Sequence, residues 1–149
     1  VTLFKLDEGV DTGPILAQEV LPLTPDETAT SLYDRVQKAH STMLRSIWPD
    51  LESGNLQPIN QDDSTATYWE GRRPHDGEIS ADMTVQYVER LVRALCEPYP
   101  GAYFVDPEKG KIVVWSGRPV RAAKSAPGEQ LILELSDGFY LVESYELVK

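Results

Sequence analysis

The sequence has little cysteine, little histidine and no long apolar run, and each shortage excludes a class of protein. Cys96 is the only cysteine among 149 residues, so an internal disulfide and a thiolate cluster for zinc or iron–sulfur are excluded. The two histidines, His40 and His75, have no acidic or histidine partner at ligand spacing, and we expect no metal site. No segment approaches the roughly 18 consecutive apolar residues of a membrane span. These features favour a soluble protein of the reducing cytoplasm.

Positive charge is also scarce. Fourteen Lys and Arg face 24 Asp and Glu, which gives a formal charge of -10 and a molecule that repels polyanions as a whole. With 41% apolar residues the chain is typical of a globular protein with a modest core. Because residues 1–6 have strand character from the first position, we expect the sequence to begin inside a folded domain whose N-terminal part is missing.

Residues 1–54 have an α/β pattern. Two β-type runs, 1–6 and 15–21, flank an acidic turn at 7–14. A helix start follows at Thr24 or Thr28, and apolar residues then recur every three or four positions. This stripe consists of Leu32, Val36, Ala39, Met43, Ile47 and Leu51. It predicts a long amphipathic helix that Pro49 kinks or restarts and Gly54 ends.

Residues 55–67 are polar and aperiodic, which predicts a linker. In the second domain, 68–149, a shorter helix with apolar positions from Val85 to Leu95 ends before Pro98. The rest has strand period, in runs at 102–105, 111–115, 130–135, 139–143 and 145–148. About five short strands behind one helix predict a small OB-like β-barrel or a small sandwich.

The acidic turn at 7–14, with sequence DEGVDTGP, offers one candidate catalytic group, Asp11. Asp-Thr-Gly-Pro is good turn chemistry, so one interpretation is purely structural. The other is a carboxylate presented at a strand end by a glycine-flanked loop, as general acid–base groups often are. The spacing of Gly9 and Gly13 does not match a phosphate-binding loop, and no serine lies in a nucleophile elbow.

Several segments, spread nearly end to end, share a pattern with one family. They are 1–3, 7–18 (DEGVDTGPILAQ), 26–28 with Leu32, 51–54 (LESG), 76–79 (DGEI), 93–94 and 98–102 (PYPGA). In this order and separation they resemble the second half of the formyltransferase family that uses 10-formyltetrahydrofolate, which includes methionyl-tRNA formyltransferases and amino-sugar N-formyltransferases. The block at 7–18 is the most specific part.

The resemblance implies a fold class of α/β plus β: the C-terminal piece of a Rossmann-like catalytic domain in 1–54, followed by the OB-like domain in 68–149. It also implies 10-formyltetrahydrofolate as co-substrate and a primary amine as acceptor. Asp11 matches the Asp of the family's Asn, His and Asp site, where it would orient the His and order a water. Gly9 and Gly13 would let the backbone approach the pterin; a structural turn is the alternative for both glycines.

The departures from the family pattern are as informative. The family's Asn-x-His and Ser-Leu-Leu-Pro elements precede its Asp, and nothing in this sequence matches them, so we expect the chain alone to be inactive. Neither His40 nor His75 can substitute, because both follow Asp11. The segment Ile79-Ser80-Ala81 lacks the aromatic residue that relatives carry two positions after the Ile.

The acceptor is suggested by residues 68–74, YWEGRRP, which look more like the Arg-Pro element of sugar formyltransferases than the Lys-bearing stretch of the tRNA enzymes. Arg72 and Arg73 are therefore candidate acceptor-binding residues for an amino-sugar nucleotide, with initiator aminoacyl-tRNA as the other acceptor. A basic run with no acidic residue from 109 to 124 favours nucleic acid unless it is a solvated face; it contains Lys109, Lys111, Arg118, Arg121 and Lys124. Tyr99, Tyr103 and Trp115 could stack on bases or pack the core. The competing function is a non-catalytic OB-like module that binds nucleic acid or a sugar nucleotide.

Overall fold

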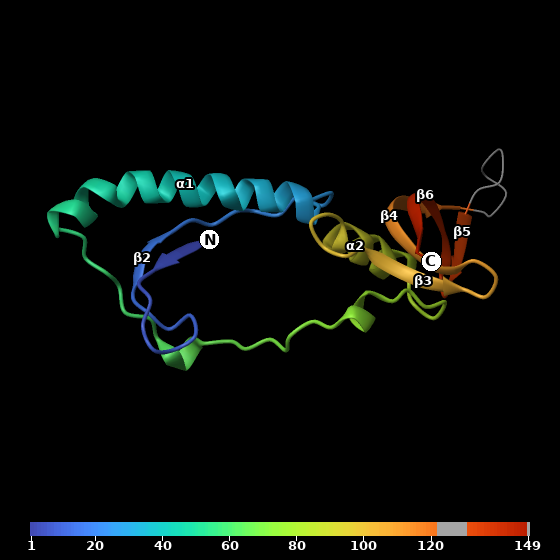
Figure 1. Ribbon diagram of the computed structural model, residues 1–149, viewed down its shortest axis with the longest axis horizontal. Coiled ribbons are helices and arrows are strands. Elements are labelled where there is room, and N and C mark those ends of the chain that lie inside the picture. The colour runs from blue at the N-terminus through green and yellow to red at the C-terminus, as the bar shows by residue number, and fades with distance from the viewer. Residues whose placement is uncertain (122–130, 149) are drawn as a thin grey trace. The chain divides into compact units, whose positions relative to one another are not determined.

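The computed structural model describes residues 1–121 and 131–148, and its contacts group the chain into two units (Figure 1). Unit 1 comprises residues 1–25 and 31–70, and unit 2 comprises residues 26–30 and 71–149. The division predicted from sequence, with a linker at 55–67, stays a prediction; the contacts group residues 55–70 with unit 1. No helix among the described residues is long and apolar enough to cross a membrane.

Unit 1 contains the two strands and the long helix predicted for residues 1–54. Strands β1 (Thr2–Phe4) and β2 (Ile15–Gln18) pair antiparallel, with Leu3 opposite Ala17. Helix α1 (Ala29–Ser53) buries Ala39 and Met43 of the predicted stripe. Its last apolar position, Leu51, is 42% exposed, so the stripe is covered only in part.

The ends of α1 decide between the alternatives left by the sequence. The helix begins at Ala29, directly after Thr28, so a start at Thr24 is wrong. It continues through Pro49 to Ser53, and the predicted restart as a second segment is not observed. Gly54 follows with φ +74°, a left-handed conformation that a glycine adopts without a Cβ penalty, as predicted for the C-terminal stop.

The polar segment after α1 returns to the strands. Ile59 exchanges two backbone hydrogen bonds with Ile15, of 2.8 and 2.9 Å. A short 3-10 helix η1 (Asp63–Thr65) follows, and the carboxylate of Asp62 accepts hydrogen bonds from the amide and hydroxyl of Ser64. These hydrogen bonds lower the pKa of Asp62. Residues 55–67, which their composition predicts to be a linker, are thus hydrogen-bonded to β2 through Ile59.

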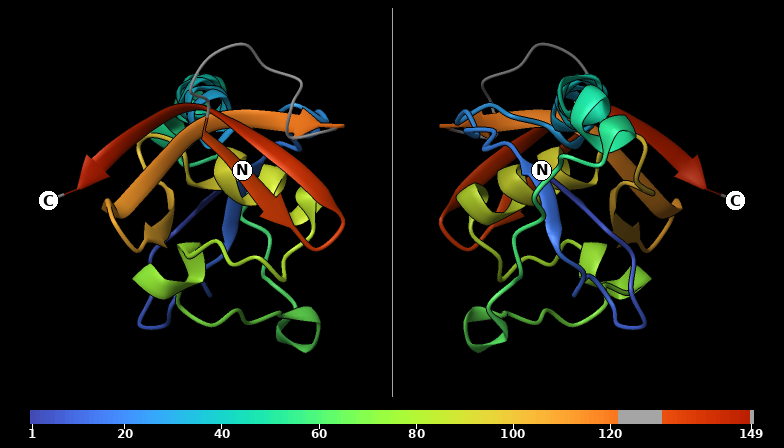
Figure 2. Two further views of the ribbon diagram at one scale, coloured as in Figure 1. Left: turned by 90° about the vertical axis from the view of Figure 1, so that its right-hand side faces the viewer. Right: turned by 90° about the vertical axis from the view of Figure 1, so that its left-hand side faces the viewer.

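Unit 2 is built on one antiparallel sheet. It consists of β3 (Ala102–Asp106), β4 (Gly110–Val120), β5 (Leu131–Leu135) and β6 (Gly138–Val148), in the order β3-β4-β6-β5. The prediction of five short strands is wrong, because the runs at 139–143 and 145–148 form the single strand β6, which Figure 2 shows as one bent strand ending at the C-terminus. Gln130, the predicted first residue of the third run, lies outside the described residues.

The sheet curls into a half-barrel because the β4–β6 pairing is irregular at its middle. The register shifts between Val114 and Gly117, and such bulges bend a strand and increase its twist. A Cβ on Gly117 would lie 2.4 Å from the carbonyl oxygen of Leu141, so only glycine permits this approach. The four described strands form an open, curled sheet, and closure into an OB-like barrel stays a prediction.

Helix α2 (Val85–Leu95) lies against the curled sheet (Figure 2) and supplies the core of unit 2. Thr84 caps it by accepting a hydrogen bond from the Tyr87 amide at 3.2 Å. Its inward face packs on β4 and β6 through the buried cluster Val88, Val92, Val114, Tyr140 and Val142, which Ile79, Ala102 and Leu135 complete. The helix and its end before Pro98 agree with the sequence prediction. Ala81 is exposed, so the absence of an aromatic residue there leaves no gap in this core.

Tyr140 gives the core of unit 2 a testable pH dependence. Burial, with the charges of Glu89 and Glu143, raises the pKa of its phenol to about 12. Because the pKa of the phenol is higher in the folded state, its contribution to stability is complete below about pH 10 and is lost as the pH rises towards 12.

We therefore expect Tyr140→Phe to flatten the fall in unfolding free energy between pH 10 and 12, measured by urea unfolding across that range. The matched control is Tyr145→Phe on the same strand, where the ring is 48% exposed. An unchanged pH slope in Tyr140→Phe, equal to that of the control, would contradict the assignment.

Candidate functional site

The loop between β1 and β2 carries Asp11, Gly9 and Gly13, and its ends are fixed by the backbone. The Lys5 amide donates to the Pro14 carbonyl at 2.9 Å, which closes the loop. Gly13 is buried at this closure, and a Cβ there would lie only 1.6 Å from the Lys5 carbonyl oxygen. Any side chain would force the strands apart, so glycine is required by the loop itself.

A second set of hydrogen bonds shapes the tip of the loop. One carboxylate oxygen of Asp7 accepts from the Gly9 amide at 3.0 Å and from the Thr12 hydroxyl at 2.7 Å. A Cβ on Gly9 would lie 2.1 Å from that hydroxyl oxygen. The Asp7 carboxylate therefore makes the hydrogen bonds that stabilise this turn. Asp7 was not predicted as a site residue, and its only local signal in the sequence is the glycine two positions later.

Asp11 has an unusual backbone and an exposed side chain. Its φ is +58°, a left-handed conformation that is uncommon outside glycine. Gln61 fixes this backbone, since its amide nitrogen donates to the carbonyls of Asp11 and Gly13 at 2.8 and 2.7 Å. The polar composition of residues 55–67 does not predict this contact, because it joins residues that are 50 positions apart in the sequence.

The Asp11 carboxylate makes no hydrogen bond or ion pair with any other described residue. The side-chain hydrogen bonds of this turn are made by Asp7 and not by Asp11; the structural and the catalytic interpretation of Asp11 both stay predictions. The arrangement holds the backbone of Asp11 in place and leaves its carboxylate available to a ligand.

Arg72 and Arg73 lie in unit 2, at the entry to the 3-10 helix η2 (Pro74–Gly77). Asp76 holds this entry, because its carboxylate accepts from the Arg73 amide at 2.6 Å. Both arginines border a cavity of about 640 Å³ between this segment, one face of α2 and the turn at 99–101. Tyr87 and Arg90, which were not predicted as site residues, border the same cavity from α2; their three-residue spacing was the available signal.

Two cations of the predicted basic run already have partners. Lys111 lies over the Tyr103 ring, 3.9 Å from its centroid, and Arg118 pairs with Glu143 at 2.9 Å. Lys124 lies outside the described residues. Tyr103 is engaged by this lysine, whereas Tyr99 is 51% exposed and borders the cavity. Among residues 1–121 and 131–148 no cluster of three or more metal-ligating side chains is found.

The loop closure is directly testable by substitution. We expect Gly13→Ala to disrupt the β1–β2 pairing, because the new methyl group would collide with the Lys5 carbonyl. Hydrogen exchange should show at least about tenfold faster exchange at the Lys5 and Ile15 amides. Gly71→Ala is the matched control, since a Cβ there has no described atom within 4 Å. Equal protection in both variants would show that the loop tolerates a side chain at residue 13.

Comparisons with known protein families and structures agree with this architecture. The family described as Formyl transferase matches residues 1–47, and Formyl transferase, C-terminal domain, matches residues 72–144. Together the two matches cover most of both units.

Solved structures of similar fold come from three kinds of protein. HypX from Aquifex aeolicus in complex with tetrahydrofolic acid is 20% identical with a TM-score of 0.77, over 99% of this chain and 27% of HypX. Methionyl-tRNA formyltransferase from Clostridium thermocellum is 22% identical with a TM-score of 0.64, over 99% of this chain and 55% of that protein. The N-formyltransferase from Helicobacter canadensis, in complex with folinic acid and dTDP-3-aminofucose, is 16% identical with a TM-score of 0.69, over 97% and 55%. The chain thus spans between about a quarter and about half of these proteins.

Proposed function

Because the chain belongs to the formyl transferase family, we propose that it is part of an enzyme that transfers a formyl group from 10-formyltetrahydrofolate to a primary amine. The supporting observation is the β1–β2 loop, in which other residues carry the turn and Asp11 keeps an uncommitted carboxylate. Two of the similar structures are complexes with tetrahydrofolic acid and with folinic acid, which supports a folate co-substrate.

The chemistry requires three things of such an enzyme. The amine must lose a proton as it attacks the formyl carbon, the tetrahedral oxyanion must be stabilised, and the leaving folate nitrogen must gain a proton. In our proposal the Asp11 carboxylate orients and charge-stabilises a general base, as a buried carboxylate fixes an imidazole in other enzymes. Gly9 and Gly13 act by shaping the loop that presents Asp11, with the folate placed against this backbone.

In our proposal the general base is the family's His and the oxyanion donor is its Asn. This sequence matches neither residue. We therefore propose that the chain works as part of a longer polypeptide and that residues 1–149 alone do not transfer formyl groups. The partial coverage of HypX and of the two formyltransferases supports this view. With one cysteine in the sequence, the cytoplasm is the compartment we propose.

The role of Asp11 can be tested in the protein that carries this chain together with the Asn-x-His element. We expect Asp11→Asn to lower turnover on the order of a thousandfold. The melting temperature should hardly change, because the side chain is exposed and makes no described contact. The matched control, Asp34→Asn on the exposed side of α1, should keep full turnover. Normal turnover in Asp11→Asn would leave this residue a purely conformational role.

An amino-sugar nucleotide is the acceptor that we favour over initiator aminoacyl-tRNA. The net charge of -10 opposes a long polyanion, and two cations of the basic run are already engaged with Tyr103 and Glu143. Arg72 and Arg73 border a cavity of small-molecule size instead.

The acceptor class can be decided by titrating the full chain with initiator tRNA at increasing salt. We expect binding no tighter than that of an unrelated RNA of equal length, because the acidic surface repels both. Specific, tight binding with a steep loss in salt would contradict the sugar-nucleotide proposal and favour the tRNA acceptor.

The second candidate function is a non-catalytic module that binds nucleic acid or a sugar nucleotide, and the cavity beside Arg72 and Arg73 is the feature that favours it. The coding sequence upstream of residue 1 separates the two candidates. An Asn-x-His and a Ser-Leu-Leu-Pro element there would support the enzyme, whereas their absence would support the module.

A further inference from the structure

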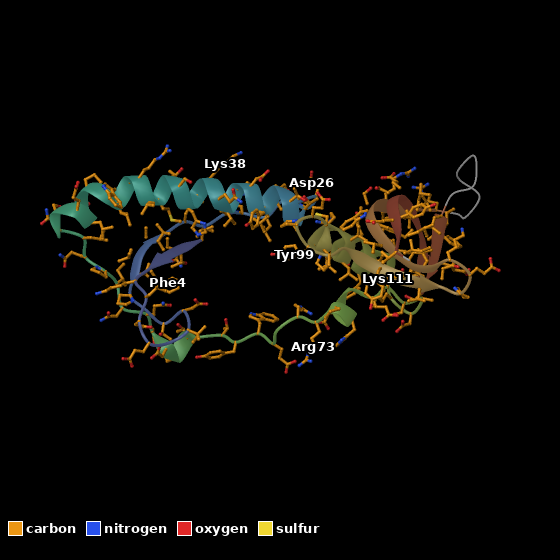
Figure 3. All side chains as sticks on the ribbon, in the orientation of Figure 1. Phe4, Asp26, Lys38, Arg73, Tyr99 and Lys111 are labelled. Atoms are coloured by element: carbon orange, nitrogen blue, oxygen red, sulfur yellow. The ribbon has the colours of Figure 1, made fainter. Side chains whose placement is uncertain are left out.

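We propose that Gln61 is a positioning residue for the formyl transfer reaction, because its side-chain amide holds the backbone of Asp11 in the conformation that presents the carboxylate. This role rests on the proposed function, since Gln61 acts through Asp11. Gln61 lies 50 residues after Asp11, in a segment with the composition of a linker. In Figure 3 the loop that follows the labelled Phe4 and the segment that leads into η1 lie side by side.

The backbone of Asp11 needs support from another part of the chain. Asp11 is the one residue other than glycine with a positive φ, +58°, in the described part of the chain. Aspartate tolerates this left-handed conformation elsewhere because its short side chain hydrogen-bonds to nearby backbone groups. The Asp11 carboxylate makes no hydrogen bond with any described residue. The conformation is therefore stabilised from outside the residue.

Gln61 supplies that support through one nitrogen atom. Its Nε2 donates to the carbonyl of Asp11 at 2.8 Å and to the carbonyl of Gly13 at 2.7 Å. A primary amide carries two N–H donors, one for each carbonyl. Among the described residues Gln61 is the one hydrogen-bond partner of Asp11, since the Asp7 carboxylate binds other residues of the loop.

The chain is fixed on both sides of Gln61. Two residues earlier, Ile59 exchanges backbone hydrogen bonds of 2.8 and 2.9 Å with Ile15 of β2. The next residue, Asp62, accepts from the amide of Ser64 at 3.0 Å and from its hydroxyl at 2.6 Å. The backbone of Gln61 is thus already placed, and binding the loop costs little conformational freedom beyond that of its own side chain.

The direction of the Asp11 carboxylate depends on this contact, because a change of φ redirects the Cα–Cβ bond. A displacement of about 1 Å can lower the rate of an enzyme on the order of a hundredfold. The simpler alternative is that Gln61 only stabilises the fold of unit 1. The two roles differ in one respect, since a positioning residue matters only while the Asp11 carboxylate is present.

The backbone of Asp11 can be followed in the full chain by NMR residual dipolar couplings. Gln61→Glu keeps the shape of the side chain but replaces both donors by a carboxylate that the two carbonyls repel. We expect residue 11 to leave the left-handed region in this variant. Gln57→Glu is the matched control, because it adds the same charge in the same segment, where the side chain binds only the Asn55 carbonyl at 3.3 Å.

Gln61→Met, which has neither donors nor charge, repeats this measurement without the added charge and replaces Gln61→Glu if that variant does not fold by circular dichroism. An unchanged φ at residue 11 in the folded Gln61 variants would overturn the proposal whatever the activity.

A double-mutant cycle in the protein that carries this chain together with the Asn-x-His element measures the effect on the reaction. We expect Gln61→Glu to lower kcat at least about tenfold. KM for 10-formyltetrahydrofolate should change less than about threefold, because the hydrogen bonds of Asp7 and of the Lys5 amide still close the loop. In the Asp11→Asn background the same substitution should lower kcat less than about twofold, because the group that Gln61 positions is gone.

An equal fall in kcat in both backgrounds would show that Gln61 acts on the fold alone and would overturn the proposal. A kcat of Gln61→Glu equal to that of Gln57→Glu would overturn it as well. Failure of the proposed function gives a different result, because Asp11→Asn would then keep normal turnover. Low turnover in Asp11→Asn with normal turnover in Gln61→Glu contradicts only the role of Gln61.

Discussion

The contact between Gly13 and the Lys5 carbonyl is the constraint on which the candidate catalytic loop depends. A Cβ would lie 1.6 Å from that oxygen, so the closed loop exists only because residue 13 has no side chain. Closure brings Asp7 within reach of the Gly9 amide and the Thr12 hydroxyl, and it places the carbonyls of Asp11 and Gly13 where Gln61 binds both. The left-handed conformation of Asp11, costly by itself, is held by this set of bonds.

The candidate site residues of the two units carry charges of opposite sign. Unit 1 presents a carboxylate on a fixed backbone, whereas unit 2 presents three arginines around an apolar cavity. In unit 2 the supports are equally specific, since Gly117 allows the sheet to curl, and α2 fills the curled face with Val88 and Val92 while an adjacent part of its surface borders the cavity. One helix thus contributes to both the core and the cavity, and Leu91 and Leu95 border both.

Local sequence patterns predicted the helices and strands whose formation depends on residues that are close together in the sequence. Alternation and periodicity located both strands of unit 1, helices α1 and α2, and strands β3 and β5 with the first half of β4, because burial of one face dictates residue type at each position. The resemblance identified the loop and the family. The patterns could not show that β6 runs unbroken past Ser144, because exposed residues at its far half carry no burial signal. They also could not assign Gln61 to the loop or Arg90 to the cavity, since both contacts join segments that are distant in sequence.

The central claim is that the loop at 7–14 places its backbone against the folate co-substrate and presents the Asp11 carboxylate beside it. The most direct measurement is an NMR titration of the intact parent protein, with carbonyl-labelled aspartate, by folinic acid. We predict that the Asp11 carboxyl signal and the amide signals of Gly9 and Gly13 shift and saturate together with folate binding. Saturation of binding with these three residues unmoved, and shifts confined to other parts of the protein, would contradict the account.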